Sequence, residues 1–180
     1  MIYIPNLLLV GGSQRNVGKT TLIIELIKRY KSDYPLIGLK VTSIYPDDGH
    51  FHGKHKPLVS EAELFEETDL SGQKDTSRML LAGASKVFYI QAEDEHILQT
   101  FEKFSKQIPS GSFILCESIS LRKHIQPGLF ILIKSVDNKV QKQSYLDVEH
   151  LADRILVSDG KSFDFDINRI SIDSGNWKLK

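Results

Sequence analysis

Continuous apolar runs alternate along the chain with segments whose apolar residues recur at helical spacing. The run at residues 6–10 has no polar alternation, as is typical of a strand buried on both faces of a sheet. Residues 19–31 instead place five apolar side chains on one helical face, at Leu22, Ile23, Leu26, Ile27 and Tyr30. The same reasoning predicts further strands at 35–41, 86–92, 112–118 and 129–135, and further helices at 74–84, 94–108 and 144–155.

Other segments are patterned less clearly. Residues 61–68 fit either a strand or a short helix, and the tail at 163–180 alternates weakly, which predicts short edge strands. Residues 42–60 are rich in His, Gly, Pro and Asp and are predicted to be a loop. The helix at 74–84 is expected to be capped by Asp75 or Thr76 and to end at Gly83.

Strands alternate with helices through most of the length, and no repeat or linker divides the chain. This order favours an α/β fold with a mostly parallel sheet and helices on both faces. We therefore predict one domain over residues 1–180.

Composition narrows the possible partners. Apolar residues make up 41% of the chain and Lys plus Arg equals Asp plus Glu, so there is no charge excess to attract nucleic acid or a membrane surface. The N-terminal apolar run has no preceding basic residue and is too short to span a bilayer. The lone Cys116 lies within an apolar strand and is expected to be a small buried residue. These features predict a cytoplasmic protein.

The sequence GGSQRNVGKTT, between the first strand and the first helix, has the residues of a phosphate-binding loop. Such a loop needs glycines for unusual backbone angles, a lysine that reaches the β- and γ-phosphates, and a hydroxyl that binds Mg²⁺. Lys19 and Thr20 supply the last two, but the first glycine is Gly12, one position earlier than usual, and Ser13 stands in its place. The predicted nucleotide contacts are Gly12, Ser13, Asn16, Val17, Gly18, Lys19, Thr20, Thr21 and Lys40.

Three side chains at or near predicted strand ends extend this site. Glu117 ends a buried strand, where open α/β sheets bind ligands, and is predicted to hold Mg²⁺ or to orient water. Asp75 is predicted to reach the metal or a substrate, although a helix cap fits its position equally well. Lys40 ends the second strand, on the side where ligands are expected, although a solvated lysine fits its position as well. The predicted catalytic set is Lys19, Glu117 and Asp75, and the predicted Mg²⁺ ligands are Thr20, Glu117 and Asp75.

His50, His52 and His55 lie within six residues of one another in the predicted loop. Three imidazoles at this density suit a transition metal, with Asp47 and Asp48 as further oxygen ligands. The spacing matches no rigid site, so phosphate contact and simple solvation remain as alternatives.

The displaced glycine resembles the loop of dethiobiotin synthetase, and three further segments resemble MobB, the molybdopterin-guanine dinucleotide biosynthesis protein B. They are IGLKVTSIYPDDGHFHGKH, GQKDTSRMLLAGA and FILCES, and the match covers roughly residues 6–135. The resemblance implies a P-loop NTPase fold, GTP binding, dimerisation and an accessory role in molybdenum cofactor biosynthesis. Whether the nucleotide is GTP or ATP depends on this resemblance alone.

The leading prediction is a MobB-like NTPase whose Mg²⁺-dependent hydrolysis is slow for the protein alone, because the sequence supplies no clear arginine finger. Arg15, inside the loop, is a candidate finger that would act across a homodimer. The loop is equally compatible with two other functions. One is an ATP-dependent kinase or ligase that resembles dethiobiotin synthetase, with Lys40 and Asp75 near the acceptor. The other is an adaptor that binds nucleotide without hydrolysis and docks a partner protein.

Overall fold

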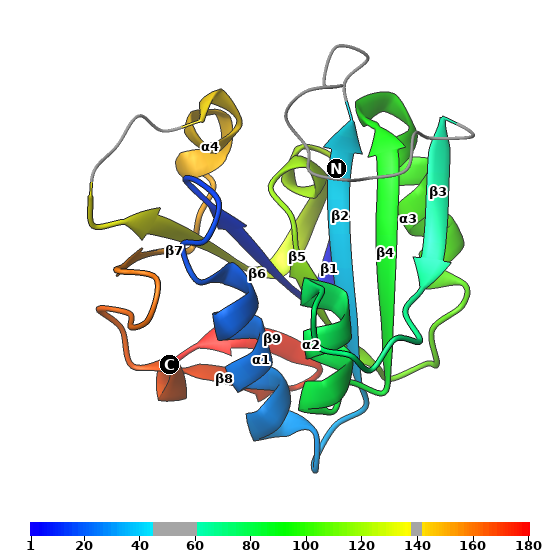
Figure 1. Ribbon diagram of the computed structural model, residues 1–180, viewed down its shortest axis with the longest axis horizontal. Helices are drawn as coiled ribbons and strands as arrows, with labels where there is room; N and C mark the ends of the chain where they lie inside the picture. The colour runs from blue at the N-terminus through cyan, green and yellow to red at the C-terminus, as the bar shows by residue number, and fades with distance from the viewer. Residues whose placement is uncertain (45–60, 138–141) are drawn as a thin grey trace.

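A computed structural model describes residues 1–44, 61–137 and 142–180, and a seven-stranded sheet forms its centre (Figure 1). The strand order is β3-β4-β2-β5-β1-β6-β7. All neighbouring pairs are parallel except β3 with β4, which is antiparallel. The mostly parallel α/β sheet predicted from the alternation of elements is therefore confirmed.

The strands match the apolar runs closely. They are β1 (Ile2–Gly12), β2 (Leu36–Ile44), β3 (Ala62–Glu66), β4 (Lys86–Glu93), β5 (Phe113–Glu117), β6 (Ile125–Ser135), β7 (Arg154–Ser158), β8 (Ile170–Asp173) and β9 (Asn176–Leu179). The ambiguous segment at 61–68 is thus a strand at the sheet edge, where its antiparallel pairing with β4 decides between the two alternatives.

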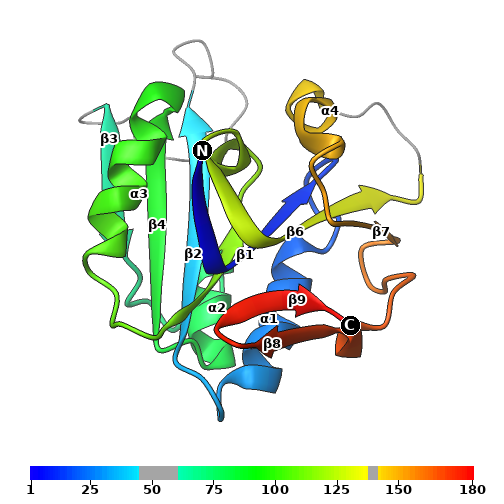
Figure 2. The ribbon, with the colours of Figure 1, turned by 180° about the vertical axis from the view of Figure 1, so that it is seen from behind.

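Helices cover both faces of the sheet. They are α1 (Lys19–Tyr30), α2 (Asp75–Ala82), α3 (Ile97–Ser105) and α4 (Gln143–Glu149), with short 3₁₀ turns at Asp94–His96, Ser120–Lys123 and Ile167–Arg169. Helices α1 and α2 lie on one face (Figure 1), while α3 and α4 lie on the other (Figure 2).

The alternation of side chains along β1 divides the core in two. Leu8 and Val10 point to the cluster under α1 and α2, whereas Leu7 and Leu9 point to the cluster under α3 and α4. All four are fully buried, because successive side chains of a strand point to opposite faces of a sheet that is covered on both. Cys116 belongs to the second cluster and is buried, as predicted.

Two predicted helix features are wrong. The helix predicted at 144–155 ends at Glu149, because the register with β6 draws Arg154 and Ile155 into β7. Neither Asp75 nor Thr76 caps α2: Lys74 occupies the cap position, and its side chain makes no capping hydrogen bond. The predicted end at Gly83 is confirmed, since its left-handed φ of 111° stops the helix.

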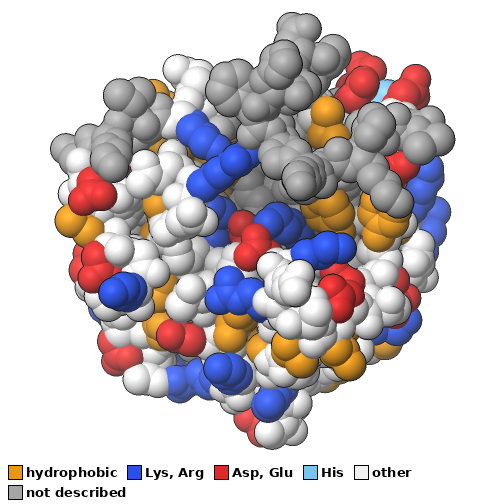
Figure 3. All heavy atoms as spheres, in the orientation of Figure 1, with side chains coloured by type: hydrophobic (Ala, Val, Ile, Leu, Met, Phe, Trp, Pro, Cys, Tyr) orange, Lys and Arg blue, Asp and Glu red, His pale blue; other side chains and the backbone are white. Residues whose placement is uncertain are grey.

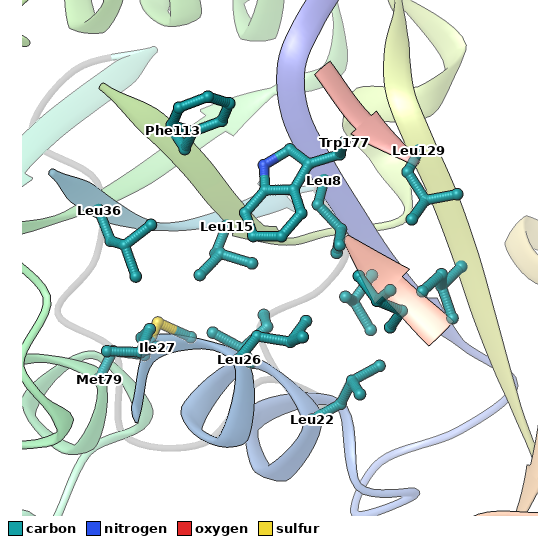
Figure 4. Close-up of a cluster of buried hydrophobic side chains, with 14 of the residues drawn as sticks. Leu8, Leu22, Leu26, Ile27, Leu36, Met79, Phe113, Leu115, Leu129 and Trp177 are labelled. Atoms are coloured by element: carbon teal, nitrogen blue, oxygen red, sulfur yellow. The ribbon is translucent and has the colours of Figure 1, made fainter. Parts of the chain in front are cut away.

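The C-terminal strands are present but do not extend the main sheet. Strands β8 and β9 pair with each other as a separate antiparallel hairpin whose turn places Ser174 and Gly175 at positive φ. Figure 4 shows Trp177 of β9 over Leu8 and Leu115, on the side of the sheet that α1 covers. Its ring makes edge contacts with Tyr30 and Phe113 at centroid distances of 5.6 and 5.9 Å.

Within the described ranges, no helix is long and apolar enough to cross a membrane.

Replacing Trp177 with Ala should destabilise the protein by about 3–5 kcal/mol, because the side chain is fully buried and its removal leaves a cavity. Urea unfolding followed by circular dichroism measures the loss. Trp177→Phe retains the ring contacts and should lose less than half as much. A loss below about 0.5 kcal/mol for the alanine variant, the range of surface substitutions, would show that the hairpin does not close this core.

Candidate functional site

The loop between β1 and α1 is shaped by its glycines. A Cβ atom on Gly12 would lie 2.7 Å from Val17 and 3.1 Å from the Lys19 side chain, so only glycine lets the loop close on itself there. Gly18 starts α1 with a left-handed φ of 96°, and Asn16 also has a positive φ of 60°. At the start of the loop, glycine is needed because the backbone of Gly12 lies close to Val17 and Lys19. At its end, Asn16 and Gly18 adopt left-handed backbone conformations.

Ser13 explains why the first glycine of the motif is displaced. Its backbone N–H donates to the Ile133 carbonyl at 2.9 Å, and its hydroxyl accepts from the Ser135 N–H at 3.2 Å. Ser13 is thus hydrogen-bonded to β6 and can carry a side chain. The backbone position that has no room for a side chain is Gly12, one residue earlier.

The Lys19 side chain is mostly buried beneath the loop, with 18% of it exposed. It donates to the Gln14 carbonyl at 3.1 Å and lies 3.9 Å from the Glu117 carboxylate. Burial lowers the pKa of Lys19 from its ordinary value of 10.5, and the attraction of Glu117 only partly opposes this. A cation held in this way gains from an anion that enters the loop.

Glu117 joins the loop to the sheet. Its carboxylate, at the carboxyl end of β5, accepts a hydrogen bond of 2.6 Å from the Thr20 hydroxyl. Lys40 of β2 pairs in register with Glu117, which places its ammonium 3.8 Å from the same carboxylate. Three elements that are distant in sequence thus meet at one buried acid.

Asp75 and Lys40 form a second charged pair. The Lys40 ammonium donates to the Asp75 carboxylate at 2.5 Å, and Arg78 lies 3.6 Å from the other oxygen. Burial alone would lower the pKa of Lys40, but Glu117 and the Asp75 hydrogen bond outweigh it and raise that pKa. Burial would raise the pKa of Asp75, but hydrogen bonds from Lys40 and Thr20 and the Lys40 charge hold it below 3.8.

These groups line a cavity of about 620 Å³. Figure 3 shows basic side chains around an acidic centre on this face. Among the predicted site residues, Gly12, Asn16, Gly18, Lys19, Thr20, Thr21, Lys40, Asp75 and Glu117 line the cavity. Ser13 and Val17 are buried behind the loop and do not line it. Arg15 and Arg78 also line it.

Sequence reasoning missed a further set of lining residues. Ser118, Ser120 and Lys123 follow β5, and Lys142 and Ser144 lie at the start of α4. These residues could have been predicted, because they lie in polar segments that follow two buried strands. In a parallel sheet, segments of this kind lie together at the carboxyl edge. Of the residues that follow these two strands, only Glu117 at the end of β5 was selected on that ground.

His50, His52 and His55, with Asp47 and Asp48, lie outside the described residues. Within the described ranges, Glu93, Glu95 and His96 bring ligand atoms within 4.8 Å of one another. Their carboxylates are partly or fully exposed, and none of the three lines the cavity.

No protein-family model matches the chain, and no curated protein sequence matches it significantly. The fold is similar to that of LpxK from Aquifex aeolicus, solved in complex with ATP, with a TM-score of 0.54 and 16% sequence identity. The match covers 91% of this chain and 50% of LpxK, so the chain spans about half the length of that protein. This likeness shows the P-loop NTPase fold, whereas the MobB-like assignment remains a prediction.

Because burial penalises the Lys19 ammonium, replacing Lys19 with Met should raise the urea midpoint of the ligand-free protein at pH 7. At a pH below the lowered pKa, Lys19 is charged in both the folded and the unfolded protein, and its partial burial in the folded protein destabilises the fold. Above pH 10.5 the side chain is neutral in both states, and this destabilisation disappears. The gain should therefore shrink at alkaline pH. Lys28→Ala, an exposed change on the same helix, should leave the midpoint unchanged. A lower midpoint for Lys19→Met would contradict the argument.

Proposed function

We propose that the protein binds a nucleoside triphosphate with Mg²⁺ in the 620 Å³ cavity and hydrolyses it slowly. The observation that carries this proposal is the contact of 2.6 Å between Thr20 of the phosphate loop and Glu117 of β5, with Lys19 beside it. ATP in the complex of LpxK, a protein of similar fold, gives independent support for a nucleotide.

The residues present fit Mg²⁺. Thr20, Glu117 and Asp75 offer hydroxyl and carboxylate oxygens, the donors that Mg²⁺ prefers, and the Thr20 hydroxyl already donates to Glu117. When bound, Mg²⁺ would neutralise charge on the phosphate oxygens. The close grouping of these three oxygen donors favours them as the metal site over residues elsewhere in the cavity.

The chain's own residues have separate tasks in the proposed hydrolysis. Lys19 would neutralise charge on the β- and γ-phosphates, while the loop backbone would hold them in place. Glu117 would orient a water whose oxygen bonds to the γ-phosphorus as the bond to the β–γ bridging oxygen breaks. The nucleoside diphosphate leaves, and the water proton passes to the phosphate product. Arg15, which lines the cavity, would serve as an arginine finger toward a second copy in a homodimer and contribute a factor of about 10³–10⁵.

An accessory role like that of MobB is the finer form of this proposal, and it depends on the sequence segments that resemble that family. It predicts a preference for GTP, whereas the LpxK complex favours ATP. Preference for guanine or adenine in the bound nucleotide therefore distinguishes the MobB-like form of the proposal from one closer to LpxK.

Calorimetric titration of ATP and GTP with Mg²⁺, followed by a phosphate-release assay, tests the proposal. Saturable binding should occur, and Lys19→Ala should weaken it by at least about 100-fold, since charge-assisted bonds to several phosphate oxygens are lost together. Lys28→Ala, on the outer face of the same helix, is the matched control. Unchanged affinity in Lys19→Ala would refute the proposal, and binding without phosphate release would favour the adaptor.

The Lys40–Asp75 pair favours transfer to a small-molecule acceptor as a second candidate function. Asp75 has a carboxylate in the cavity beside the Thr20 hydroxyl, where it is placed to accept the proton of an acceptor hydroxyl. The γ-phosphoryl group would then pass to that oxygen, and the nucleoside diphosphate would leave.

Asp75→Asn separates the second candidate from hydrolysis. We expect the wild type to transfer label from γ-labelled ATP to a compound in a small-molecule extract. The variant should transfer it about 10²–10⁴ times more slowly, because a general base is lost. Thin-layer chromatography measures both products. If label appears only in inorganic phosphate, or if Asp75→Asn transfers it at the wild-type rate, Asp75 is not the base for an acceptor.

A further inference from the structure

The cavity has a basic wall that the proposed nucleotide site does not use. We define it by five lining residues that follow β5 or begin α4, namely Ser118, Ser120, Lys123, Lys142 and Ser144. Two lysines and three serines thus line one space, with Ile119 as an apolar neighbour. Ammonium and hydroxyl donors together are the set that binds oxyanions.

The charges of this wall are balanced less completely than those around the phosphate loop. Lys40 has two carboxylates nearby, those of Asp75 and Glu117. Lys142 has no ion-pair partner among residues 1–44, 61–137 and 142–180. Burial is the largest cause of the lowered pKa of Lys19, and the charges of Lys40 and then Lys142 lower it further. An anion beside Lys142 would relieve this repulsion.

Lys123 lines the cavity and also forms an ion pair at the surface. Its ammonium lies 3.3 Å from Asp147 of α4, and Asp147 itself does not line the cavity. Both side chains are about one-third exposed, so the pair contributes little and an anion in the cavity can compete with Asp147 for the lysine.

Hydroxyl groups complete the wall. Ser118 and Ser120 are more than nine-tenths buried, and their oxygens lie 3.2 Å apart at the carboxyl end of β5. Ser118 directly follows Glu117, the residue that contacts Thr20, and Ser120 lies two residues further on. A ligand on the wall would therefore lie beside the proposed site of the γ-phosphate.

We propose that the basic wall binds the phosphate or carboxylate group of a second, non-nucleotide ligand, the acceptor of the phosphoryl group. The role as acceptor site rests on the proposed function, whereas the binding of an oxyanion by Lys123 and Lys142 does not. Lysines act as point charges toward either anion, so phosphate and carboxylate share this recognition.

Calorimetric titration of inorganic phosphate and of succinate tests the proposal on two preparations. One is the full chain saturated with Mg²⁺ and a non-hydrolysable ATP analogue, which fills the phosphate loop. The other is Lys19→Ala without nucleotide. In both, at least one probe should bind saturably, and Lys123→Ala should weaken it about ten-fold, the lower end for a charge-assisted bond. The tighter probe identifies the ligand class as phosphorylated or carboxylated.

Asp147→Asn is the matched control, because it breaks the same ion pair but leaves the Lys123 ammonium in place. The variant should bind the probe as tightly as the wild type or more tightly, since a competing carboxylate is gone. An equal loss of probe affinity in Asp147→Asn and Lys123→Ala would overturn the proposal, because it would show that the ion pair only positions α4.

The two proposals fail separately. If the analogue does not bind, the nucleotide function fails, while probe binding to Lys19→Ala that depends on Lys123 still supports the oxyanion site. If the analogue binds and neither probe does in either preparation, the basic wall is not an oxyanion site.

Discussion

Burial of the Glu117 carboxylate is the constraint on which the rest of the cavity depends. A carboxylate with only 7% of its residue exposed costs several kcal/mol unless charges and hydrogen bonds compensate. The compensation comes from Thr20 and Lys19 of the phosphate loop and from Lys40 of β2. Because β5 lies between β1 and β2, these partners reach Glu117 only in this strand order. The strand order of the sheet therefore determines both how the buried carboxylate is stabilised and how the groups of the site are arranged.

The same ion pairs define what a ligand must replace. Without ligand, the Thr20 hydroxyl donates to Glu117, and the Lys40 ammonium donates to Asp75. A triphosphate with Mg²⁺ would exchange partners within this set, so charges stay paired in both states. Lys19 is the exception, since burial lowers its pKa even with Glu117 nearby. Functional sites commonly retain such destabilising groups because ligand binding needs them.

Much of the fold could be predicted because its signals are local. Buried apolar runs marked most strands of the main sheet, and Gly83 marked the end of a helix. Strand β7 was missed because Leu151, Ala152 and Ile155 continue an apolar pattern that suits a helix, and only pairing with β6 selects a strand. Lys123 and Lys142 were missed for a similar reason: their neighbours are determined by strand order, which periodicity does not encode. The loop was recognised by its motif, and Glu117 and Lys40 were recognised because parallel sheets gather their ligands at one edge.

The conformation of the phosphate loop also depends on residues far along the chain. A Cβ atom on Gly18 would lie 3.1 Å from Phe163 and 3.4 Å from the Ser158 hydroxyl, and one on Gly160 would lie 3.2 Å from the Asn16 carbonyl. The segment after β7 therefore packs directly on the loop, while Trp177 packs beside Tyr30 of α1. The motif supplies residues that can adopt the loop, but contacts from about 140 residues later hold it in that shape. Preorganisation of this site is thus a property of the whole sheet and its C-terminal segment, and not of the short motif alone.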